Sequence, residues 1–372
     1  YAAANEVLNK IAQQQARRRP DCRVLSVNWG PWDGGMVTPA LKQLFASEGV
    51  AVIPLQAGAD YLMQEIAGNG PVELVITGAV PAAAGTETVQ TTVNDSTLHV
   101  AFERRLSIEE YAFLKSHVMN GVAVLPVAMM AEWFAHGAMH DNPGLLYAGF
   151  DELRVFKGVT LAPDGSIDLQ VMAGLAIKSG AVEIVPVELR SGNTLHARAR
   201  VVLAADYPAC PRSPVTDIAG IYPFRADEIY HNGQLFHGPA LQGITSIDAC
   251  SDRGMAAQVM AAPRPSAWME KPIRSTWLSD PLALDAAFQM MILWCFRQLG
   301  AGSLPTAIAR YRQYRKGFPL EGTQVVIRID EHTEHRARST IEFLDPNGVL
   351  VARMEGYECI IDVSLNKAFA RN

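Results

Sequence analysis

The stretch LKSHVMNGVAVLPVAMMAEW, residues Leu114 to Trp133, places one histidine shortly before a proline and a long apolar run. Pro126 suits the first turn of a helix, where its missing N–H costs nothing. Val127 to Met139 then continue almost without polar residues, which indicates a helix buried on most sides. We therefore expect His117 in a loop that leads into a core helix. Free N–H groups at that helix N-terminus could hold a carbonyl oxygen.

Length and composition narrow the class of protein. The chain has 372 residues, of which 49% are hydrophobic, so two or three structural units with their own cores are expected. A formal net charge of −6 argues against a nucleic-acid binder or an anionic-membrane binder. The sequence shows no signal peptide and no long apolar span, which predicts a cytoplasmic protein.

The cysteines and the first residue carry two further predictions. None of the five cysteines forms a Cys-x-x-Cys pair, so reduced thiols are expected rather than a disulfide or zinc framework: Cys22, Cys210, Cys250, Cys295 and Cys359. The chain begins at a tyrosine, in mid-helix by its pattern, which suggests a piece of a longer polypeptide.

The first 80 residues alternate between helix and strand. The pattern predicts a helix over Tyr1 to Arg19, a strand over Cys22 to Trp29, a helix over Ala59 to Ala67 and a strand over Val72 to Ile76. The Gly-rich phosphate turn of a dinucleotide-binding sheet is missing, so we expect only a partial Rossmann-like α/β segment. Residues 81–95 are rich in Ala, Thr and Gly and are predicted to be a linker.

The remainder predicts two successive units, each with one apolar helix and several strands. In the first unit, a strand over Leu98 to Arg105 and a capping box at Ser107 and Glu110 precede His117. Strands are then predicted at four places: Leu146 to Leu161, Ile167 to Ile177, Val182 to Leu189, and Leu195 to Leu203.

After a proline-rich connector, residues 207–223, the layout repeats. Pro281 begins an apolar helix that Gly300 ends, and strands are predicted at Gln324 to Asp330, Arg336 to Leu344 and Val349 to Tyr357. In each unit, we expect an antiparallel sheet wrapped around its own helix, which is an α+β arrangement.

Two resemblances to known families follow from short motifs. YAAAN at the N-terminus, followed by LSVNWGPWDGGMV, resembles the C-terminal end of a ketoreductase domain of a type I polyketide or polyunsaturated fatty acid synthase. The resemblance implies that Tyr1 is the catalytic tyrosine and Asn5 its orienting partner. Because the nucleotide-binding half is missing, the preferred interpretation is a packed remnant without reductase activity. NADPH would serve only a complete ketoreductase and is not expected to bind here.

The second resemblance covers roughly His99 to Leu365. His117, Gly121 and Pro126 match the HxxxGxxxxP pattern of a synthase dehydratase domain. The segment LDAAFQ, with Asp285 and Gln289, matches the aspartate motif of that family. The segment HGPALQGI, which begins at His237, resembles its YGP-type motif. The predicted domains are a ketoreductase remnant (1–80), the linker (81–95), an N-terminal hot-dog (96–206), the connector (207–223), a C-terminal hot-dog (224–365) and a tail (366–372).

This resemblance implies a double hot-dog fold that acts on a 3-hydroxyacyl chain carried by the phosphopantetheine of an acyl carrier protein. Water would be removed to give a 2-enoyl thioester. An imidazole is a natural base for the proton beside a thioester, so His117 is the predicted base. Asp285 is the predicted acid, because an apolar helix raises the pKa of a carboxyl. Gln289 shares its helix face and is predicted to support it.

The resemblance also implies substrate-binding and supporting positions. The substrate-binding residues would be Gly121, Val122, Pro126, Gly238 and Pro239, with backbone N–H groups of residues 121–124 polarising the thioester carbonyl and Gly121 permitting close approach. The chain departs from the family at His237, which stands where a tyrosine is usual, so activity and substrate preference depend on a titratable ring.

Three alternatives remain open. The double hot-dog could be a catalytically silent, dimerising scaffold, or the same pair could catalyse hydration or double-bond isomerisation.

His136 and His140 are spaced as metal pairs can be, but they have no evident third ligand, so no metal is predicted. No cofactor is predicted for the dehydratase. The expected partners are an acyl carrier protein, neighbouring synthase domains and a second copy of the chain.

Overall fold

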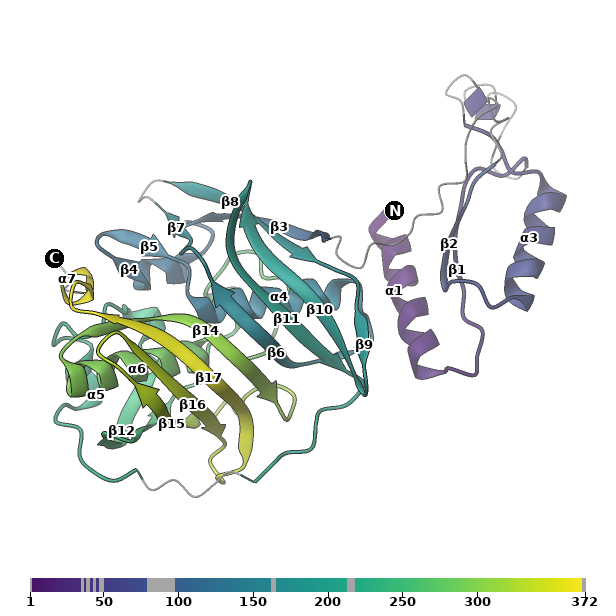
Figure 1. Cartoon of the computed structure of the whole chain (residues 1–372). Coiled ribbons are helices and arrows are strands. Elements are labelled where there is room, and N and C mark those ends of the chain that lie inside the picture. The colour runs from purple at the N-terminus through teal and green to yellow at the C-terminus, as the bar shows by residue number, and fades with distance from the viewer. Residues whose placement is uncertain are drawn as a thin grey trace. The chain divides into compact units, whose positions relative to one another are not determined.

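The computed structural model describes residues 2–34, 37, 41–42, 45–46, 50–78, 98–161, 165–212 and 218–369. Backbone contacts divide the chain into a unit over residues 1–94 and a larger unit over residues 95–372 (Figure 1). Tyr1 and the predicted linker, residues 81–95, lie outside the described residues. No described helix has the length and apolar character that crossing a bilayer requires.

Two helices and a pair of strands have both ends described in the smaller unit. Helix α1 spans Ala2–Arg18 and α3 spans Leu55–Ala67, while β1 (Ser26–Trp29) pairs with β2 (Glu73–Ile76) in parallel. Parallel pairing with a helix between the strands is typical of α/β folds. The strand predicted from Cys22 begins only at Ser26.

The first half of the larger unit is built around α4, Val127–His140. A short 3₁₀ helix, η1 (Ala112–Ser116), precedes it. The strands of this half are β3 (His99–Ser107), β4 (Val118–Met119), β5 (Val122–Val124), β6 (Leu146–Val155), β7 (Thr160–Leu161), β8 (Ser166–Ala173), β9 (Ile177–Ser179), β10 (Val182–Ser191) and β11 (Thr194–Ala204). Helix α4 packs on β3, β6, β8, β10 and β11, which explains why its residues are apolar on nearly every side.

The second half is built around α6, Pro281–Leu299. Its other elements are α5 (Ala226–Ile229), η2 (Pro239–Leu241), β12 (Ile244–Ser251), β13 (Gly254–Val259), η3 (Pro265–Ala267), β14 (Gly302–Gln313), β15 (Thr323–His332), β16 (Arg336–Leu344), β17 (Leu350–Asp362) and α7 (Leu365–Phe369). The predicted ends of α6 are confirmed, because Pro281 is its first residue and Gly300 caps it in the left-handed region at φ +71°.

The sheets of the two halves are joined, which the sequence did not indicate. Among the described residues, β6 of the first half pairs with β14 of the second, so one twelve-stranded sheet curves around both helices in the order β12-β13-β15-β16-β17-β14-β6-β11-β10-β8-β3, with β9 beside β10 (Figure 1). Each helix is wrapped by its own part of this antiparallel sheet, as expected, but the two parts are continuous. Helices α4 and α6 also contact each other.

Several predicted boundaries differ from the structure. The strand predicted over Leu146 to Leu161 is interrupted after Val155, and the one over Ile167 to Ile177 after Ala173. The predicted tail, 366–372, begins inside α7, whose Phe369 is fully buried. Ser107 caps a turn rather than a helix, because its Oγ accepts from Glu110 N at 3.3 Å while the 3₁₀ helix starts later.

Candidate functional site

A tight hairpin fixes the position of His117. Asn120 (φ +49°) and Gly121 (φ +72°) form the two-residue turn between β4 and β5, and this turn type requires both to be left-handed. The hairpin returns Val124 to His117, where the Val124 N–H donates to the His117 carbonyl at 2.9 Å. His117 Nδ1 donates to the Val124 carbonyl at 2.7 Å. A carbonyl oxygen only accepts, so Nδ1 carries the proton and the lone pair lies on Nε2.

Gly121 therefore has a different role from the predicted one. It is exposed at the hairpin tip, and an added Cβ there would meet nothing within 4 Å, so it is needed for its backbone conformation and not for close approach. The close approach occurs at Gly238, where a Cβ would lie 2.8 Å from Ser116 Cα. The Gly238 N–H donates to the Ser116 carbonyl at 2.7 Å, which brings the HGP segment against the residue before His117.

The other predicted substrate-binding residues fall in different surroundings. Val122 is half-buried in β5, and Pro126 is buried as the N-cap of α4. Pro239 is exposed as the first residue of η2. The Val124 N–H is already bonded to His117, so it is unavailable as one of the predicted donors to a thioester carbonyl.

Asp285 lies in the second turn of α6 and is 3% exposed. Burial raises the pKa of its carboxyl from the ordinary 3.8 to about 7, although a hydrogen bond from Gln289 Nε2 to Oδ2 at 2.8 Å opposes the rise. Gln289 also donates to the Leu241 carbonyl at 2.7 Å. Gln289 thus holds the carboxyl between the helix and the HGP segment, as its spacing from Asp285 had suggested.

His117, His237 and Asp285 come together from three separate segments of the larger unit. All three are buried, and one nitrogen or oxygen atom from each lies within 4.8 Å of the others. His237 Nε2 is 3.5 Å from Asp285 Oδ2, and the two histidine ring centroids are 5.2 Å apart. Burial lowers the pKa of His117 from 6.5 to about 4, while its bond to Val124 opposes this. Near neutral pH, a neutral imidazole therefore faces a carboxyl that is partly protonated.

Known proteins resemble this chain at the level of sequence and of fold. The polyketide synthase dehydratase N-terminal domain family matches residues 223–361, which lie in the second half of the larger unit. One chain of the polyunsaturated fatty acid synthase of Thraustochytrium sp. is 32% identical over 348 residues, which are 90% of this chain and 12% of that protein.

Solved dehydratase domains share the fold. That of a mycocerosic acid synthase-like polyketide synthase is 22% identical, with a TM-score of 0.55, and covers 70% of this chain and 90% of its own. That of a trans-AT polyketide synthase from Brevibacillus brevis is 18% identical, with a TM-score of 0.57, over 70% of this chain and 93% of its own. The dehydratase domain of PpsC from Mycobacterium tuberculosis, solved with C12:1-CoA, is 21% identical, with a TM-score of 0.54, and covers 70% of this chain and 93% of its own.

The larger unit is therefore similar in sequence to a polyketide synthase dehydratase family over residues 223–361 and shares the fold of solved dehydratase domains. The prediction of an α+β double hot-dog is confirmed by these likenesses and by the two wrapped helices. The chain spans about an eighth of the fatty acid synthase protein that it matches, since it covers 12% of that protein.

Residues that no motif indicated also hold the His117 cluster together. The Tyr230 hydroxyl donates to Gln289 Oε1 at 2.9 Å and accepts from Ile244 N at 2.9 Å, so it extends the chain of bonds that ends at Asp285. Phe236 stacks on the neighbouring His237 ring at 4.1 Å and meets His117 edge-on at 4.9 Å. The sequence shows that these are apolar or aromatic residues, but it does not show which of them meet.

Glu132 on α4 connects the two halves of the larger unit. This buried carboxylate accepts from Leu278 N at 2.7 Å, from Ser279 N at 2.9 Å and from Ser279 Oγ at 2.8 Å, just before α6 begins. It also lies 3.0 Å from His136 Nε2. His136 is therefore bound within its own helix, whereas His140 lies beside the exposed Asp141, so the pair does not form a metal site.

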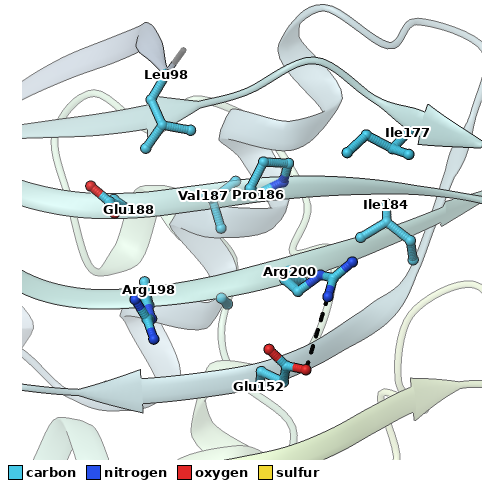
Figure 2. A pocket seen from close by; sticks show the side chains of 10 residues that line it. Leu98, Glu152, Ile177, Ile184, Pro186, Val187, Glu188, Arg198 and Arg200 are labelled. Carbon is cyan, nitrogen blue, oxygen red and sulfur yellow. Dashed lines mark ion pairs between the residues drawn. The ribbon is translucent and has the colours of Figure 1, made fainter. Parts of the chain in front are cut away.

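A hollow of about 420 Å³ lies on the outer face of the sheet, over β6, β9, β10 and β11 (Figure 2). Its rim carries exposed charges, of which Arg200 and Glu152 pair at 4.0 Å. Within the part of the chain that the structure describes, its lining contains none of the predicted site residues. The hollow is thus separate from the His117 cluster.

Proposed function

We propose that this domain removes water from a 3-hydroxyacyl thioester to give a 2-enoyl thioester, with His117 as the base and Asp285 as the acid. The observation that carries this proposal is the meeting of the two side chains, from opposite halves of the double hot-dog, in one buried cluster that spans at most 4.8 Å. Adjacent carbon atoms of one substrate can contact two groups at this separation.

The protonation states support this direction of chemistry. His117 Nε2 takes the proton from the carbon beside the thioester, and the electron pair forms the new double bond. The C–O bond breaks as Asp285 donates its proton to the departing hydroxyl, which leaves as water. The pKa of about 4 at His117 keeps the base neutral, and the pKa of about 7 at Asp285 keeps much of the acid protonated near neutrality.

The alternative of a silent scaffold predicted either a closed substrate tunnel or His117 and Asp285 pointing apart. The closeness of their donor atoms supports the catalytic proposal over the second of these signatures. Hydration of a 2-enoyl thioester is the reverse of the proposed reaction and would use the same two groups. Product analysis from both starting thioesters distinguishes the preferred direction from isomerisation.

The decisive experiment compares turnover of a 3-hydroxyacyl thioester by the wild type, His117→Ala and Asp285→Asn. Each substitution should lower kcat by a factor of about 100 or more, because each removes a proton-transfer group. Asp280→Asn is the control for loss of a buried carboxyl at the same helix N-terminus. Asp280 accepts from Ala283 N and from Ala262 N, and asparagine can keep only one of these bonds, so circular dichroism must establish that this variant is folded. Unchanged turnover in both site variants would contradict the mechanism.

We infer that the substrate is carried by the phosphopantetheine of an acyl carrier protein and that no other cofactor takes part. A cytoplasmic synthase with neighbouring domains and a second copy of the chain is the proposed setting. Residues 1–80 are proposed to be the C-terminal remnant of a ketoreductase domain, in which Asn5 is half-buried on α1. NADPH is not expected to bind there.

A further inference from the structure

The meeting of His117, His237 and Asp285 has a chemical consequence beyond proton transfer. Two imidazoles and a carboxylate form a donor set that Zn²⁺ and similar divalent transition metals prefer, whereas Mg²⁺ and Ca²⁺ prefer oxygen donors. Each of the three side chains is at least nine-tenths buried, and their donor atoms lie within 4.8 Å of one another. Among the described residues, this is the only such group.

The surroundings orient the donors as the outer partners of metal ligands do. Metal-bound histidines usually donate their other ring N–H to a carbonyl or carboxylate. His117 does so through Nδ1 to the Val124 carbonyl at 2.7 Å, which leaves Nε2 as the donor atom. Asp285 accepts from Gln289 Nε2 at 2.8 Å, so its carboxylate is also fixed.

The distances are close to those in a tetrahedral metal sphere. Bonds of about 2.0–2.1 Å at tetrahedral angles separate two ligand atoms by roughly 3.3 Å. His237 Nε2 and Asp285 Oδ2 are already 3.5 Å apart. All three donor atoms lie within 4.8 Å of one another, so a shift of roughly 1.5 Å or less would complete three ligand positions and leave the fourth for water.

We propose that His117, His237 and Asp285 form a binding site for a divalent transition-metal ion, with Zn²⁺ as the best match. A bound ion would take the lone pair of the base and the oxygen of the acid. It would therefore exclude the hydroxyacyl substrate, and metal and substrate would compete.

The test is a titration of the chelator-treated full chain with Co²⁺, which reports tetrahedral coordination through its visible absorption. We expect one equivalent to bind with the intense absorption of a tetrahedral site and to be displaced by Zn²⁺. His237→Phe, His237→Gln and Asp285→Asn should each weaken binding by about 100-fold or more, since even loss of an outer partner costs about 10–100-fold. Far-ultraviolet circular dichroism establishes that each variant is folded.

The chain offers a matched control for adventitious surface binding. His99 Nε2 lies 2.6 Å from Asp141 Oδ2, and His140 lies 3.9 Å from the same carboxylate, all at exposed positions. Asp141→Asn should leave the cobalt spectrum and affinity unchanged. The proposal is overturned if no tetrahedral absorption appears, or if binding is lost in Asp141→Asn and kept in both His237 variants.

This test is independent of the proposed dehydratase activity, because cobalt binding is measured without substrate. In a separate assay of the wild type, Zn²⁺ should raise the apparent KM for the hydroxyacyl thioester and leave kcat unchanged. Inhibition that lowers kcat alone would contradict the competition between metal and substrate, even if metal binds.

Discussion

Replacement of Asp285 by asparagine should stabilise the fold at alkaline pH and abolish turnover in the same protein. The Asp285 carboxyl is buried, and the pKa of about 7 shows that the folded state favours its protonated form. Asparagine has nearly the same shape, can accept the bond from Gln289 and never ionises. The variant therefore removes the cost of the buried charge and also removes the acid.

The magnitude follows from the difference between folded and unfolded pKa values. The Asp285 carboxyl has a pKa near 3.8 in the unfolded chain and about 7 in the folded chain. The full stability of the fold is therefore present only at low pH, where this carboxyl is protonated in both states. This stability is lost as pH rises through the interval between the two values. A gap of roughly three pKa units, at about 1.4 kcal/mol each, corresponds to about 4 kcal/mol at pH 8.

Urea unfolding of the wild type and Asp285→Asn between pH 4 and pH 8 measures this difference. The variant and the wild type should unfold alike at pH 4, and the variant should be more stable by about 4 kcal/mol at pH 8. Dehydration of the hydroxyacyl thioester should meanwhile be lost at every pH. A constant difference across the range would show that Asp285 is ionised in the folded state, and the assignment of the acid would then fail.

Three further predictions concern pH, the link between the halves and the hairpin. In chelator-treated buffer, kcat/KM should rise with pH through an apparent pKa of about 4, as His117 becomes neutral, and should fall through an apparent pKa of about 7, as Asp285 ionises. A flat profile between pH 4 and pH 8 would contradict these roles. Glu132→Gln should lower the free energy of unfolding in urea by about 3 kcal/mol because it disrupts a buried, fully bonded carboxylate, whereas the exposed Glu152→Gln should change it by less than about 0.5 kcal/mol. Gly121→Ala should cost about 1–2 kcal/mol by thermal unfolding, since only its left-handed backbone opposes a side chain there, and no loss would show that the turn relaxes freely.

The motifs indicated the proposed reacting groups because the chemistry of such groups restricts residue type. A buried carboxyl in an otherwise apolar helix, and a histidine before another such helix, stand out in composition alone. The helices themselves were predictable, because a helix wrapped by a sheet is apolar on most sides. The alternation of small apolar and basic residues in the sequence of β11 agrees with the structure, where Ala197 and Ala199 are buried and Arg198 is exposed.

Other features depend on contacts between distant segments and left little trace in the sequence. His196 alternates with Ala197 along β11 and would share the face of the exposed Arg198, yet it is buried, because its ring nitrogens form hydrogen bonds with Ser191 Oγ at 2.8 Å and the Lys157 carbonyl at 3.1 Å. The bonds of Glu132 to the segment before α6 join residues that are 146 and 147 positions apart. The meeting of His237 with His117 and Asp285 likewise joins distant segments, so the sequence spacing that draws attention to His136 and His140 does not indicate it.

The pairing of β6 with β14 sets the smallest piece of this chain that can be exchanged between related synthases. This seam aligns Phe150 with Tyr311 and runs between the half that supplies His117 and the half that supplies Asp285. A recombination point at residues 207–212 or 218–223 of the connector would cut no helix or strand, yet it would mismatch the seam and separate the proposed base from the proposed acid. Residues 98–369 are therefore the natural unit for building chimeric synthases.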